Sequence, residues 1–119
     1  MQNSEKAGIS LDSPELLKPL VIRSLRRSSV RKKIADYLFE ISPSGSYTSE
    51  IAYSVKTTPT NVIGAIRGMS TRYRDDESLL TLNIVEQIEG GKHKDIKLYR
   101  LTDFGKEIVE NLRENKKRY

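Results

Sequence analysis

The sequence contains no cysteine and no tryptophan, and it has a single histidine among its 119 residues. Without cysteine, the chain has no disulfide, no thiolate metal ligand and no cysteine nucleophile. A single histidine excludes a His-rich metal site. We find no nucleophile beside a base and no complete phosphate-binding glycine loop. The sequence therefore predicts neither an enzyme nor a bound cofactor or metal.

Long hydrophobic runs are also missing. No segment approaches the roughly 20 apolar residues that a helix needs to cross a bilayer, and residues 1–10 lack the apolar core of a signal peptide. We therefore expect a cytoplasmic protein. Residues 1–12 are polar and are expected to be flexible, and the length fits a single domain over residues 13–119.

Positive charge is abundant. The 21 lysines and arginines exceed the 16 acids and give a net charge of +5. Such a domain attracts polyanions, with nucleic acid as the first candidate and an anionic membrane as the second. One basic run contains no acid and comprises Arg23, Arg26, Arg27, Arg31, Lys32 and Lys33. Because cations are unfavourable at a helix start, we interpret this run as a site for flanking phosphate or an acidic partner. The alternative is a solvated helix start.

Proline and serine mark the first elements. Ser13 and Pro14 predict a short helical turn that Pro19 ends, and residues 20–25 are expected to be a short strand or an extended lead-in. A longer helix is predicted from Ser28 or Ser29 to Pro43. Its apolar residues recur at helical spacing and are Val30, Ile34, Leu38 and Ile41.

Threonines predict the starts of the next three helices. Thr48 is expected to cap a short second helix, Thr58 a third over about 58–70 with Pro59 at its first position, and Thr102 the last helix. Between the third and last helices, two alternating segments around a glycine-rich turn predict a hairpin over about 84–101.

This order of three helices, a β-hairpin and a final helix is the layout of a winged helix-turn-helix. The predicted class is α+β and mostly α, with a three-helix core, a two-stranded wing and a C-terminal helix. A compact winged helix passes almost directly from the third helix to the wing. Here residues 70–79 intervene, and we expect them to extend the third helix or to add a helical turn.

Several segments within residues 28–112 resemble winged helix regulators. Residues 47–52 resemble the second helix of such proteins and residues 58–69 their recognition helix, whereas Leu101-Thr102-Asp103-Phe104-Gly105-Lys106 resembles the start of the helix after the wing in MarR-like regulators. Residues 61–68, with 72–73 and 78–79, look most like archaeal members. The resemblance implies a transcriptional regulator that binds double-stranded DNA sequence-specifically and acts as a homodimer. Residues 16–25 and the C-terminal helix are the candidate dimer contacts.

Four candidate residues lie on the expected outer face of the third helix, which would enter the major groove. Asn61 has an amide suited to adenine, and Arg67 a guanidinium suited to guanine or phosphate. Thr60 is a candidate for a phosphate or a thymine methyl. Gly64 permits either close approach to DNA or close helix packing. We expect Asn61, Gly64 and Arg67 to project together into solvent.

Five further candidates would contact the DNA backbone. The amides near Thr48 and Ser49 open the second helix and are suited to phosphate. Lys92, His93 and Lys94 lie at the turn of the wing, which would follow the backbone or enter the minor groove.

Two other functions fit the same fold. One is a protein-interaction module that uses the acidic cluster at residues 75–77 and the basic run as partner surfaces. The other is sequence-neutral DNA binding. The sequence shows no obvious ligand pocket and leaves any small-molecule effector unknown.

Overall fold

A computed structural model describes residues 14–69, 77–90 and 93–117 of the chain. Its helices and strands follow the order expected for a winged helix, with one additional short strand. They are α1 (Pro14–Arg27), α2 (Ser29–Ile41), β1 (Ser46–Tyr47), α3 (Thr48–Val55), α4 (Pro59–Arg67), β2 (Val85–Gly90), β3 (His93–Leu101) and α5 (Asp103–Lys117). The expected fold class, α+β and mostly helical, is confirmed. The flexible segment predicted over 1–12 lies outside the described residues.

Helix α1 is longer than the sequence suggested. Pro19 lies inside it, so the expectation that Pro19 ends a short turn, and that residues 20–25 are extended, was wrong. A proline inside a helix removes one backbone hydrogen bond and costs about 3 kcal/mol. Val21 and Leu25 are almost completely buried, and burial of two such side chains is worth a similar amount. Packing therefore holds the helix together through the proline.

Helix α2 is the centre of the fold. It contacts all four other helices and β3, and its residues Ile34, Ala35 and Leu38 are buried in the core. Ser28 is its cap, because the Ser28 side chain accepts a hydrogen bond of 3.1 Å from the backbone N–H of Arg31. This confirms one of the two predicted caps.

The sheet has the order β1-β3-β2 and is antiparallel throughout. Strands β2 and β3 are the two strands of the predicted wing, and Val85 pairs with Leu101 at its base. Strand β1 was not predicted. It has two residues, of which Ser46 pairs with Tyr99, and two residues are too few to show an alternating pattern.

The chain returns from α4 to the wing along the end of that helix. Helix α4 ends at Arg67 instead of near residue 70, and Gly68 follows with a φ of 95°, which favours glycine. The backbone N–H of Leu79 donates to the carbonyl of Ala65, and that of Leu80 to Ile66, both at 3.0 Å. These bonds satisfy carbonyls that the helix end leaves open. Most of the expected insertion, residues 70–76, lies outside the described residues.

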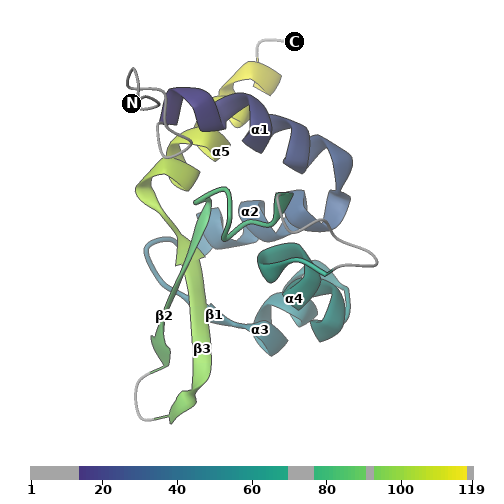
Figure 1. The fold of residues 1–119 in the computed structure, drawn as a ribbon, viewed down its shortest axis with the longest axis vertical. Coiled ribbons are helices and arrows are strands. Elements are labelled where there is room, and N and C mark those ends of the chain that lie inside the picture. Colours follow the sequence, from purple (N-terminus) through teal and green to yellow (C-terminus); the bar gives the residue numbers. More distant parts are fainter. Residues whose placement is uncertain (1–13, 70–76, 91–92, 118–119) are drawn as a thin grey trace, which may run out of the picture.

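Different helices and strands lie at the two ends of the molecule. Figure 1 shows α1 and α5 at one end of the long axis, with α3, α4 and the wing toward the other end and α2 between them.

Helix α5 starts in direct contact with the base of the wing. The side chain of Thr102 accepts a hydrogen bond of 2.8 Å from the N–H of Gly105. A Cβ on Gly105 would lie 2.3 Å from the carbonyl oxygen of Ile84. Only glycine fits there. Within the described ranges, no helix has the length and apolar character needed to traverse a bilayer.

Candidate nucleic-acid interface

Helices α3 and α4 form the predicted helix-turn-helix. Lys56 ends α3 in the left-handed conformation, with a φ of 59°, and the N–H of Thr57 donates to the carbonyl of Ala52 at 2.9 Å. Thr58 then caps α4, because its side chain accepts a hydrogen bond of 3.1 Å from the N–H of Asn61. Pro59 is the first helical residue. The predicted start of the third helix is therefore confirmed.

The start of α3 differs from the prediction. Thr48 is its first helical residue and Tyr47 its cap, so the expectation that Thr48 caps the helix was wrong. The reason is that strand β1 leads straight into α3, and the N–H of Tyr47 donates to Oε1 of Glu50 at 2.9 Å. Thr48 is half-buried and Ser49 is exposed. The Glu50 carboxylate therefore lies beside the amides that we expected to hold a phosphate.

The exposed face of α4 is formed by Thr60, Ile63 and Arg67. Their spacing of three and four residues places them on one side of the helix. The opposite side carries the buried side chains Val62, Ala65 and Ile66. We call the three exposed residues the outer face of α4.

Arg67 connects the outer face of α4 to both strands of the wing. Its Nε donates to the hydroxyl of Tyr99 on β3 at 3.0 Å, and its Nη2 donates to Oε1 of Gln87 on β2. The guanidinium also lies 5.8 Å from the centre of the Tyr99 ring, within the range of a cation–π contact. Sequence reasoning missed Gln87 and Tyr99, because nothing in the local pattern links residues so far apart.

Asn61 and Gly64 do not share this face. Gly64 is buried and Asn61 half-buried, so the expectation that Asn61, Gly64 and Arg67 project together into solvent was wrong. Nδ2 of Asn61 donates to Oγ1 of Thr57 at 3.0 Å, which turns the amide toward the start of the helix. Burial of Gly64 agrees with close helix packing, the alternative to close approach of DNA at this position.

The wing carries charges of both signs. Nε of Arg100 lies 2.8 Å from Oε2 of Glu86 on the neighbouring strand, and Lys97 and Glu89 are exposed. Of the predicted wing contacts, His93 and Lys94 belong to β3, but their side chains lie outside the described structure. Lys92 lies outside it entirely.

The basic run is engaged within the chain. Three of its arginines surround Glu77, whose side chain is only 6% exposed. Oε2 of Glu77 lies 3.0 Å from Nη1 of Arg27 and 3.7 Å from Nε of Arg23, and Oε1 lies 3.5 Å from Nη1 of Arg31. The hydroxyl of Ser24 donates to the Glu77 carbonyl at 2.7 Å. We call these residues the Glu77 cluster.

This cluster corrects two expectations. Glu77 is not part of an exposed acidic patch, and Asp75 and Asp76 of that predicted patch lie outside the described residues. Arg31 is buried, so it is not available to phosphate or to an acidic partner. The reason is an ion pair between residues 46 positions apart, which a local reading of charge does not reveal.

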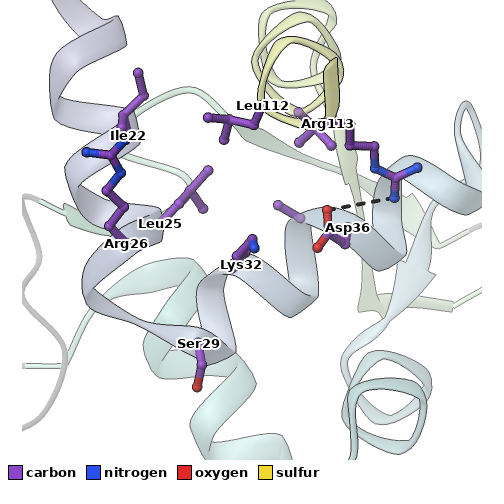
Figure 2. Close-up of a pocket in the computed structure, with 10 residues that line it drawn as sticks. Ile22, Leu25, Arg26, Ser29, Lys32, Asp36, Leu112 and Arg113 are labelled. Carbon is purple, nitrogen blue, oxygen red and sulfur yellow. Dashed lines mark ion pairs between the residues drawn. The ribbon is translucent and has the colours of Figure 1, made fainter. Parts of the chain in front are cut away.

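A pocket of about 940 Å³ lies between α1, α2 and α5. Figure 2 shows Leu25 and Leu112 pointing toward one another across it. At its edge Arg113 pairs with Asp36, with 3.7 Å between Nη2 of Arg113 and Oδ1 of Asp36. Sequence analysis found no obvious ligand pocket, because the lining of this one comes from three helices whose apolar residues look like ordinary core positions. Elsewhere, the described residues contain no group of three histidine, cysteine or acidic side chains placed to hold a metal ion.

Comparison with known sequences assigns the chain to a family. The sequence model of a family described as EarA-like matches residues 21–112. The chain belongs to the EarA-like family. A relative within reach of sequence comparison is the uncharacterized protein MJ0905 of Methanocaldococcus jannaschii, which is 46% identical over 96 residues, or 81% of this chain and 84% of that protein. Its archaeal source agrees with the archaeal character of the resemblance described above.

Solved structures with a similar fold include two proteins of bacteria. The S. aureus MepR–DNA complex matches with a TM-score of 0.62 and 16% identity, covering 84% of this chain and 75% of MepR. The adhesin competence repressor AdcR of Streptococcus pyogenes matches with a TM-score of 0.53 and 12% identity, covering 98% of this chain and 76% of AdcR. At these identities the likeness establishes the fold, and it confirms the predicted winged helix.

Proposed function

We propose that this member of the EarA-like family is a transcriptional regulator that binds double-stranded DNA sequence-specifically, with α4 in the major groove. The observation that carries the proposal is the outer face of α4, which is exposed on a helix fixed to a projecting wing. A major groove is about 12 Å wide and accepts one helix. The proposal is supported by the crystal structure of MepR, which has a similar fold and was solved in complex with DNA.

The wing supplies the second contact in this proposal. It extends past α3 and α4 toward one end of the molecule (Figure 1), and the bonds from Arg67 to Tyr99 and Gln87 set its position relative to α4. A hairpin held in this way reaches the backbone or the minor groove beside the helix that occupies the major groove. The net charge of +5 favours the approach to DNA.

The regulator acts as a homodimer in this proposal, with contacts through α1 and α5. Both helices extend to the end of the molecule opposite the one toward which the wing projects (Figure 1), so a two-fold contact there leaves both copies of α4 open to successive major grooves. Light scattering of the protein with and without DNA tests the contact, and a monomer in both states would refute it.

The experiment that tests the function selects ligands from a pool of random duplexes with the purified chain. We expect one sequence to be enriched, and to bind at least about a thousandfold more tightly than random duplex at physiological salt. Equal affinity for every duplex, with a steep salt dependence, would replace the proposal by sequence-neutral binding. No binding even at low salt would reject DNA as the ligand.

A matched pair of variants locates the contact. Thr60→Asp places a negative charge on the outer face of α4 and is expected to weaken binding to the selected duplex at least about tenfold, because it repels phosphate and base acceptors. Ser44→Asp makes the same change at an exposed position between α2 and β1, outside α4 and the proposed dimer contact, and is expected to leave the affinity unchanged. Equal losses in both variants would show only an effect of net charge.

A further inference from the structure

Part of the hydrogen-bonding capacity of α4 is used within the chain. The two side chains best suited to base edges already have partners within the chain, since the Asn61 amide donates to Thr57 and the Arg67 guanidinium donates to Tyr99 and Gln87. The remaining members of the face are Thr60 and Ile63. Both of these side chains carry methyl groups, so the outer face of α4 presents apolar as well as polar groups to the edges of bases.

Ile63 is exposed where an isoleucine is normally covered. Its exposed fraction is 43%, and among the described residues the other large exposed hydrophobic side chain is Tyr53 on α3, at 87%. The neighbouring Val62 and Ile66 are fully buried, so the core beneath α4 is already filled without Ile63. A partner that covers the Ile63 side chain would gain the free energy of removing apolar surface from water.

The major groove presents one apolar group on the edges of the base pairs, the C5 methyl of thymine. We propose that Ile63 recognises thymine through this methyl and is a specificity-determining residue of α4. The inference rests on the proposed function, which places α4 in the major groove. Thr60 lies one turn earlier on the same face, and its own methyl extends the apolar surface.

Deoxyuridine provides the test, because it pairs as thymine does and lacks only the C5 methyl. Each thymine of the selected duplex is replaced singly by deoxyuridine, and the affinity of the full chain is measured by fluorescence anisotropy. We expect a loss of about fourfold at the position that Ile63 contacts, the effect of one buried methyl. The Ile63→Ala protein is expected to bind the thymine and deoxyuridine forms of that position equally.

Tyr53→Ala is the matched control, because it removes the other exposed large hydrophobic side chain while leaving α4 intact. It is expected to keep the preference for thymine. Wild-type protein that prefers the selected sequence but is indifferent to every deoxyuridine substitution would overturn the inference and leave the proposed function standing. Retention of the preference in Ile63→Ala would also overturn it. Wild-type protein without sequence preference would overturn both. The wild-type arm requires no variant, so a folding defect cannot obscure the result.

Discussion

The arginines of the Glu77 cluster and Arg67 on α4 are held by partners of different charge. In the Glu77 cluster, three arginines surround a carboxylate that is 6% exposed, so part of their charge is neutralised inside the chain. On α4, Arg67 is held by a tyrosine hydroxyl and a glutamine amide, which are both uncharged. These hydrogen bonds hold the Arg67 side chain in position, and its full positive charge remains available to attract phosphate.

The comparison shows why a count of basic residues does not locate a binding surface. The run from Arg23 to Lys33 looked like the strongest basic patch in the sequence. Half of its six basic residues nevertheless form ion pairs with the buried Glu77, which follows α4 in the chain. Arg67 is isolated in the sequence and lies beside the wing. The partner of an arginine therefore says more about its role than the density of charge around it.

The largest effect is expected from Glu77→Gln. This change leaves the charge of Arg31, whose side chain is 4% exposed, without its carboxylate in the interior. Removal of one partner of a buried ion pair typically costs about 3–5 kcal/mol, so the free energy of unfolding measured with urea should fall by about that amount. Glu40→Gln breaks the exposed pair with Arg113 and is the control, with an expected loss below about 1 kcal/mol. Equal losses would show that the Glu77 cluster behaves as a surface pair.

A smaller effect, on DNA binding, is expected at the contact between α4 and the wing. Arg67→Ala should weaken binding to the selected duplex by about 1–3 kcal/mol and lower the salt slope by about one, because it removes a charge. Gln87→Ala should weaken binding less and leave the salt slope unchanged, since it loosens the wing without changing charge. The double variant should bind like Arg67→Ala alone, because both changes break the same contact. Additive losses, measured by anisotropy, would mean that Arg67 and Gln87 act separately.

The smallest effect is expected from Arg23→Ala. Its Nε lies 3.7 Å from Glu77 and its side chain is 53% exposed, so the loss of stability should stay below about 1 kcal/mol. Provided that light scattering shows the same oligomeric state as the wild type, affinity for the selected duplex should stay within about twofold, because α1 lies at the end of the molecule away from the wing (Figure 1). A tenfold loss of affinity, with stability retained, would restore the original interpretation of the basic run as a phosphate site.

The parts of the fold that could be predicted are those determined by neighbouring residues. Ser28, Thr58 with Pro59, and Thr102 each cap a helix as expected, because a cap is a contact between residues three positions apart. Pro19 was misinterpreted, since the packing of Val21 and Leu25 outweighs its local effect. A local preference predicts structure where tertiary packing does not oppose it.

The candidate site was less predictable than the fold. Thr60 and Arg67 are exposed as expected, but Gly64 is buried and Asn61 is turned toward Thr57. Ile63 was assigned no role, because an apolar residue in a helix is ordinarily a core residue and its neighbours on both sides are buried. The direction of a side chain depends on which elements cover the helix, and that information is not local.

The missing side chain of Gly105 has a consequence for the geometry of the proposed dimer. With only 2.3 Å between a hypothetical Cβ and the carbonyl oxygen of Ile84, any larger residue must shift either the start of α5 or the backbone at the base of the wing, and a shift of the helix would tilt α5. Since α5 belongs to the proposed contact between subunits, such a tilt would change the distance between the two α4 helices of a dimer. A residue that touches neither DNA nor the second subunit would thus help to determine how many base pairs separate the two halves of an operator.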